Sequence, residues 1–322
     1  MKRNEENAMK KLWYGVPAAL AGFCLWQFQE LCRFGVSEYV ITHEKIKTPR
    51  TAVVIADLHG FRYGKDNRRL IAAVQSAKPD MILIPGDMIV GKQYTTYRTA
   101  EALMRRLRGI APVYYSYGNH ESRSRQRDSR SYDCFMEYEK RLREDGITLL
   151  NNESVSVGED ICLTGLELPL NCYRKGVVTP YPHTFVSRHV PKADRERYQI
   201  LLAHNPAYAK EYAGWGANLS LCGHFHGGLI RIPGVGSLIS PQFQWRPDYD
   251  AGEFAFGKDR AIVSRGMGTH TFHIRIFNRA ELVVVRLRPV TVQPAPFAKV
   301  PTALSRCCAA NFAHKIGALL MK

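Results

Sequence analysis

The chain has 322 residues, of which 45% are hydrophobic and 23% are charged, and its formal net charge is +16. This length and balance are typical of one large or two ordinary globular domains and exclude an intrinsically disordered chain. The eight cysteines are irregularly spaced, which predicts neither a disulfide framework nor a zinc finger. The excess of Lys and Arg indicates anionic surroundings, such as phosphate-bearing substrates, a membrane surface or nucleic acid.

The N-terminal segment begins with basic residues and continues as an apolar run. Residues 12–29 contain no charged side chain and follow Lys10 and Lys11. A helix of this length extends roughly 27 Å, which is enough for a bilayer core. We therefore expect an uncleaved signal-anchor helix within residues 1–44, which would attach the protein to a membrane and place the catalytic body outside the cytoplasm. Because Pro17 interrupts the run, an amphipathic surface helix and a buried terminal helix remain alternatives.

Short apolar runs that end in polar residues alternate with helical patterns from residue 51 onward. The predicted strands are residues 51–56, 81–85, 113–117, 161–166, 198–203, 217–221, 261–264, 272–277 and 281–287, and the predicted helices are residues 67–77, 95–107 and 131–144. Strands that alternate with helices predict βαβ units, whose ligand sites lie at the carboxyl ends of the strands. Residues 167–197 are polar and show no clear periodicity before a short helix near their end.

The C-terminal tail, residues 291–322, is Pro-rich at first and basic afterwards. Its second half, residues 303–321, fits a basic amphipathic helix at a membrane surface or a disordered segment, and these two interpretations stay open.

Five predicted strand ends carry side chains of the kinds that bind metal ions. They are, in chain order, Asp57 and His59, Asp87, Asn119 and His120, His204, and His224 and His226. Each motif alone has an ordinary explanation as a turn or a helix N-cap. Five such motifs, each directly after its own strand, are hard to explain as turns and predict a metal site. Mixed His and carboxylate ligands suit Mn, Fe or Zn better than Mg or Ca.

The order of these motifs resembles that of the calcineurin-like metallophosphoesterases, and within them the membrane-associated bacterial branch called YkuE- or YaeI-like. The resemblance covers roughly residues 45–290, including a glycine-containing turn at residues 264–269 and the segment 275–277. It implies a four-layer αββα sandwich, in which two mixed β-sheets are flanked by helices. We expect this domain to follow the N-terminal anchor helix and to precede the tail.

The resemblance also implies two divalent metal ions bridged by Asp87. One ion would be held by Asp57, His59, Asp87 and His226, and the other by Asp87, Asn119, His204 and His224. Two ions about 3.5–4 Å apart can hold the attacking and leaving oxygens of a phosphoryl displacement, with a metal-bridging hydroxide as the implied nucleophile. His120 would protonate the leaving oxygen.

One position departs from the family pattern. Family members commonly carry a second Asp three residues after the first, and this Asp orients the catalytic histidine. Here that position is Val90. We therefore expect another partner for His120, with Glu121 as the candidate, and either reduced activity or a substrate with a good leaving group.

Several arginines follow His120 within residues 122–130. They form either a solvated loop or a substrate-binding lid, in which Arg123 and Arg125 hold a second phosphate or an anionic headgroup.

The leading hypothesis is a membrane-associated, dinuclear-metal phosphohydrolase. It would cleave phosphomonoester, phosphodiester or pyrophosphate bonds in a phosphorylated small molecule or in a lipid-linked, cell-envelope substrate. One rival is a UDP-2,3-diacylglucosamine-type pyrophosphatase on the same scaffold, and another is a non-catalytic metal-binding scaffold. Basic patches interleaved with aromatic residues are not apparent, so no specific nucleic-acid partner is expected.

Overall fold

A computed structural model of the chain describes residues 2–181, 184–228, 230–269 and 273–290, with side chains from Val16 onward. The chain divides into two units after Pro289. The second unit includes the predicted basic tail, residues 291–322, and this tail lies outside the described residues.

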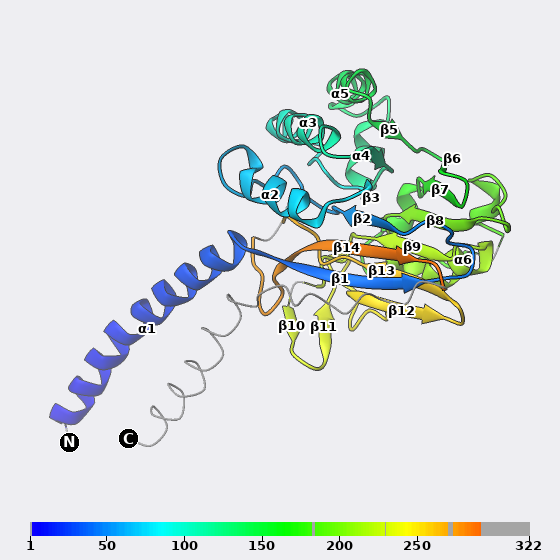
Figure 1. The fold of residues 1–322 in the computed structure, drawn as a ribbon. Coiled ribbons are helices and arrows are strands. Elements are labelled where there is room, and N and C mark those ends of the chain that lie inside the picture. Colours follow the sequence, from blue (N-terminus) through cyan, green and yellow to red (C-terminus); the bar gives the residue numbers. More distant parts are fainter. Residues whose placement is uncertain (1, 182–183, 229, 270–272, 291–322) are drawn as a thin grey trace. The chain divides into compact units, whose positions relative to one another are not determined.

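Two six-stranded mixed sheets form the centre of the fold (Figure 1). The first sheet contains β1 (Phe34–Thr42), β14 (Ala280–Arg288), β2 (Arg50–Val54), β3 (Met81–Ile84), β4 (Val113–Tyr115) and β5 (Thr148–Leu149), in that spatial order. The second sheet contains β12 (Gly252–Phe256), β13 (Asp259–Val263), β9 (Leu219–Cys222), β8 (Tyr198–Ala203), β7 (Ile161–Leu166) and β6 (Glu153–Val157). Strands β2 to β5 run parallel to one another, as do β7, β8, β9 and β13. A separate hairpin pairs β10 (Ile230–Ile232) with β11 (Gly236–Ile239).

Alternating side chains of the strands build three apolar cores. On β3, Ile82 and Ile84 pack against α2 (Arg68–Ala77), α3 (Tyr94–Arg108) and α5 (Tyr132–Glu144). Leu83 points the other way, toward Leu202 of the second sheet. On the far side of that sheet, Leu201 packs against α6 (Ala209–Trp215). The layers are therefore helices, sheet, sheet and helix, which is the predicted arrangement of two mixed sheets flanked by helices.

Helix α1 (Lys2–Leu31) occupies the segment for which an anchor is predicted. Within the described part of the chain, no helix combines the length and the apolar character that crossing a bilayer requires. Membrane anchoring therefore stays a prediction. The Gln27 side chain ties the end of α1 to the body, because it donates to the Arg275 carbonyl at 3.1 Å and accepts from the Arg275 N–H at 2.9 Å.

Strand β1 was not predicted, and it pairs with β14 along its whole length. The first sheet therefore begins at Phe34, upstream of residue 45, where the sequence places the start of the domain. As an edge strand β1 alternates half-buried and exposed positions, so it lacks the continuous apolar run that marks β2 and β3.

The predicted strand at residues 272–277 is wrong over its described part, residues 273–277. There only Ile276 forms a bridge, to Ile230. The reason is the buried Arg275 guanidinium, whose hydrogen bonds to four loop carbonyls hold this segment as a loop. The short helix expected near the end of residues 167–197 is a single 3₁₀ turn, Val186–Arg188. The other predicted helices and strands are present, and their ends differ by at most two residues.

Candidate dinuclear metal site

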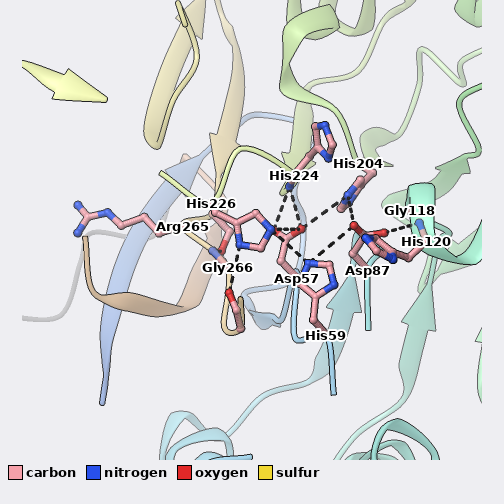
Figure 2. A network of polar contacts seen from close by, with 12 residues as sticks. Asp57, His59, Asp87, Gly118, His120, His204, His224, His226, Arg265 and Gly266 are labelled. Atoms are coloured by element: carbon pink, nitrogen blue, oxygen red, sulfur yellow. Dashed lines mark hydrogen bonds and ion pairs between the residues drawn. The ribbon is translucent and has the colours of Figure 1, made fainter. Parts of the chain in front are cut away.

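The polar residues that follow β2, β3, β4, β8 and β9 meet at one edge of the two sheets. Ligand atoms of Asp57, His59 and His226 lie within 4.8 Å of one another, and so do those of Asp87, His204 and His224. A third group, His59, Asp87 and His120, overlaps both. Figure 2 shows the two carboxylates between the imidazole rings, while Arg265 points away from them. The structure thus brings together most members of the two sets that the family resemblance implies.

Short distances connect these side chains. His59 Nε2 lies 3.2 Å from His226 Nε2, and His226 Nε2 lies 3.6 Å from Asp57 Oδ1. His204 Nε2 lies 3.1 Å from Asp87 Oδ2 and 3.6 Å from Asp57 Oδ1. Imidazole nitrogens and carboxylate oxygens that lie this close together can bind a shared cation.

Asn119 provides the test of whether cations fit. It is the first residue of α4 (Asn119–Ser124), and its Oδ1 atom is buried without a hydrogen-bond partner among the described residues. A buried acceptor without a partner costs about 1–3 kcal/mol. A divalent cation would satisfy this oxygen and neutralise the buried carboxylates of Asp57 and Asp87. The residues present therefore fit two metal ions.

The loops around the carboxylates are tightly folded. Asp57, His59, Asp87, His224 and His226 all adopt a positive φ, between 51° and 67°. Such backbone conformations are unfavourable for residues other than glycine and gather at functional sites. A Cβ atom at Gly118 would overlap the Asp87 side chain, and one at Gly223 would overlap that of Asp57. Glycines at these two positions let neighbouring loops approach the carboxylates.

Burial and mutual charge perturb the ionisation of the cluster. Burial raises the pKa of Asp57 to about 7. Burial also raises the pKa of Asp87, but His204 and His120 outweigh it and hold that pKa well below its usual value. For His204, burial lowers the pKa, whereas Asp87 raises it, and the result is about 9. Because metal ligands must be deprotonated, cations that bind here would displace protons from these side chains.

The buried Glu121 carboxylate contacts several backbone groups. It accepts hydrogen bonds from the backbone N–H groups of Asp87 at 2.9 Å, Met88 at 2.8 Å and Gly118 at 3.0 Å. The Tyr115 hydroxyl donates a fourth, at 2.6 Å. Glu121 therefore fixes the loop that carries Asp87, and its role as the partner of His120 stays a prediction.

A cleft borders the cluster. Asn119, His120, His224 and His226 line it on the side of the cluster, and Arg123, Tyr173, Lys175, Phe243 and Ile274 are among its other lining residues. The structure separates the two predicted substrate-binding arginines. Arg123 lines this cleft, whereas Arg125 borders a neighbouring hollow and pairs with Glu167 at 2.9 Å. Tyr173, Lys175 and Phe243 were missed, because they lie in segments without periodicity or a motif.

Arg275 and Asn278 support the cluster from behind. The Arg275 guanidinium donates to the carbonyls of Arg265, Gly266 and Asn278 at 3.1 Å and of Gly268 at 2.8 Å. The Gly268 carbonyl lies 3.2 Å from His226 Nδ1, so it accepts the Nδ1 proton and leaves Nε2 facing the cluster. Asn278 Nδ2 donates to the carbonyls of His226 and Gly228 at 2.6 Å. From the sequence this segment was predicted as a strand and as part of the family resemblance, but not as a support for the ligands.

Two mixed sheets with a buried cluster of Asp and His at their common edge are the features of a metallophosphoesterase. The chain belongs to the calcineurin-like phosphoesterase family, whose sequence model matches residues 50–228. This range contains every predicted ligand, and the family depends on two metal ions. The protein is thus an enzyme of the metal-dependent phosphoesterase class.

Two relatives in sequence confirm the resemblance. The chain is 28% identical to YkuE of Bacillus subtilis, an uncharacterized metallophosphoesterase, over 70% of this chain and 73% of that one. It is 27% identical to the phosphodiesterase YaeI of Escherichia coli, over 74% of this chain and 82% of that one. Among solved structures, TT1561 of Thermus thermophilus is similar with a TM-score of 0.43 and 13% identity, over 68% of this chain and 91% of that one.

Proposed function

We propose that the protein hydrolyses phosphodiester or pyrophosphate bonds at a dinuclear centre. Asp57, His59, Asp87 and His226 hold one divalent ion, and Asp87, Asn119, His204 and His224 hold the other. The observation that supports this proposal is the pair of ligand groups on either side of Asp87. The ions, when bound, lower the pKa of water and neutralise charge on phosphoryl oxygens. The mixture of imidazole and carboxylate ligands favours Mn, Fe or Zn.

Two side chains in the cleft act on the substrate. His120 follows the ligand Asn119 and lines the cleft, where it donates a proton or a hydrogen bond to the leaving oxygen. Arg123 lines the same cleft and binds a phosphate of the substrate through its guanidinium.

The lining of the cleft favours an amphiphilic substrate. Arg123 and Lys175 are cationic and can bind a phosphate, whereas Phe243 and Ile274 are apolar and can pack against an aliphatic group. The phosphodiesterase named among the relatives supports a diester as the reacting group. We therefore propose a lipid-linked phosphodiester or pyrophosphate, and a membrane as the place where the enzyme meets it. The extracytoplasmic location of the catalytic body stays a prediction.

The test is metal-dependent hydrolysis by the full-length chain in detergent. Removal of residues 1–40 is unsuitable, because it would take most of β1 out of the first sheet. Metal-free protein receives Mn²⁺, Fe²⁺, Zn²⁺ or Mg²⁺, and hydrolysis of bis- and mono-(p-nitrophenyl) phosphate is followed. We expect turnover with the first three ions, faster on the diester, and its loss in Asp87→Asn but not in the exposed control Asp248→Asn. Absence of turnover in the wild type with every ion would refute the proposal.

A further inference from the structure

Exposed apolar side chains gather around the mouth of the cleft. They come from β10, from the loop after β11 and from the loop before β14, and they are Ile230, Ile232, Phe243, Trp245, Ile274 and Phe277. Trp245 is 70% exposed and Phe277 is 62% exposed, while Phe243 and Ile274 also line the cleft. We call these six residues the rim surface. Several large, exposed apolar side chains beside an active site mark a place where another molecule binds.

Backbone and ring contacts join the rim surface to α1. The Arg231 N–H donates to the Ile276 carbonyl at 3.2 Å, so β10 lies beside the loop that carries Phe277. The Phe277 ring centroid lies 5.9 Å from that of Trp26 in α1. Figure 1 shows α1, the β10–β11 hairpin and the loop before β14 on the same side of the sheets. The three segments therefore present one connected surface.

Helix α1 is itself apolar and exposed on all sides over residues 16–25. Val16, Leu20 and Leu25 are each more than half exposed in this stretch. A helix that is apolar all round is stable only where an apolar medium surrounds it, as in a protein core or in lipid. A flat protein partner would cover one of its sides, whereas lipid covers all of them.

The charges near the rim surface decide between lipid and a second copy of the chain. Arg174, Lys175 and Arg246 are exposed there, and Lys175 Nζ lies 4.9 Å from the centre of the Phe243 ring. Aromatic and aliphatic anchors flanked by cations match acyl chains beneath anionic headgroups. A second copy of a chain with a formal net charge of +16 would instead bring like charges together.

We infer that the rim surface and α1 dock on an anionic lipid bilayer, with the mouth of the cleft facing the headgroups. The phosphate of a substrate then enters the cleft from the headgroup layer while its acyl chains stay in the bilayer. This reading of the substrate rests on the proposed function, whereas the docking itself depends only on the exposed surface.

Quenching of Trp245 fluorescence by brominated acyl chains tests the docking. The full chain is added to vesicles of phosphatidylcholine and phosphatidylglycerol, with and without bromine on the acyl chains. The wild type is compared with Trp245→Phe and with Trp215→Phe, because Trp215, the last residue of α6, is buried against the second sheet. The emission of Trp245 is the part of the wild-type emission that is missing in Trp245→Phe, and we expect brominated lipid to quench it. The emission of Trp215, which is missing in Trp215→Phe, should stay unquenched. If brominated lipid quenches the emission of Trp245 and that of Trp215 equally, the docking is refuted.

Two measurements on the same samples separate the docking from the proposed function. Turnover of bis-(p-nitrophenyl) phosphate with Mn²⁺, without quenching of Trp245, would overturn the docking and leave the function standing. Quenching without turnover with any of the ions would overturn the function and leave the docking standing. Sedimentation in detergent then compares the wild type with an Ile232→Ser/Trp245→Ser double variant. A wild-type dimer that becomes a monomer in the variant would make the occupant a second copy and overturn the inference.

Discussion

The backbone N–H of Gly91 donates a hydrogen bond to Nδ1 of His120 over 3.4 Å. Gly91 directly follows Val90, the position at which the family commonly carries an Asp that orients this histidine. A backbone amide therefore contacts the ring beside the position at which the family carries that carboxylate. In the neutral ring this contact leaves the proton on Nε2, from which the ring can donate a hydrogen bond.

His120→Ala should lower kcat by about 10²–10⁴-fold and change KM little, because a proton or hydrogen-bond donor to the leaving oxygen acts in the transition state. The loss should be larger for a phenyl ester than for a p-nitrophenyl ester, whose leaving group needs less assistance. Metal content should be retained. The measurement is kcat for both esters in the wild type, in His120→Ala and in the control His189→Ala. An equal loss for both esters would contradict a role at the leaving oxygen.

Arg123 and Arg125 should differ in their effect on substrate binding. Arg123→Glu should raise KM for an anionic diester roughly tenfold or more, because it replaces a favourable contact in the cleft with repulsion. Arg125→Glu is the matched control, since Arg125 lies outside the cleft and is 46% exposed in its pair with Glu167. The measurement is KM for the diester in both variants, from steady-state kinetics. A larger KM effect from Arg125 would show that the substrate extends into the neighbouring hollow.

Arg275→Ala should destabilise the fold and weaken metal binding together. The substitution leaves four loop carbonyls without their buried donor, and unsatisfied groups of this kind cost about 1–3 kcal/mol each before relaxation. Loss of support for His226 should lower metal affinity about 10–100-fold. Thermal unfolding and metal titration of Arg275→Ala are compared with Arg105→Ala, whose side chain is 61% exposed and forms surface ion pairs that contribute little to stability. If the two variants lose equal stability and metal affinity, Arg275 does not support the metal ligands.

Asp160 should make stability depend on pH in the acidic range. Its carboxylate accepts from the N–H groups of Lys47 at 2.7 Å and Thr48 at 3.0 Å, and from Arg50 Nη1 at 2.7 Å. Burial raises the pKa of Asp160, but these contacts outweigh it and hold the pKa below its usual value. A lowered folded-state pKa stabilises the protein above the unfolded pKa of about 4, and this contribution is lost as the pH falls through the folded value.

Denaturant unfolding of the wild type and Asp160→Asn measures this contribution. The wild type should be more stable at neutral pH, and the difference should shrink below the usual pKa of an Asp. A difference that does not change with pH would show that the contacts of Asp160 do not depend on its charge.

The sequence predicted the strands that carry the site because they are buried on both faces. Runs such as residues 53–56 and 200–203 are continuously apolar, and the polar residues that follow them are recognisable as candidate ligands. The residues that line the cleft could not be predicted in this way. Phe243 and Lys175 come from irregular loops, and neither periodicity nor a motif marks them. Arg275 was assigned to a strand from its apolar neighbours, since a pattern of neighbours does not reveal hydrogen bonds to distant carbonyls.

The most direct test of the central claim is to locate the metal ions. Crystals of the wild type soaked in Mn²⁺ are measured at the manganese absorption edge, together with crystals of Asp87→Asn. The account predicts two anomalous peaks about 3.5–4 Å apart on either side of Asp87. One peak should lie near Asp57, His59 and His226, and the other near Asn119, His204 and His224, with at least one lost in the variant. A single ion away from Asp87, or two peaks that persist unchanged in Asp87→Asn, would contradict it.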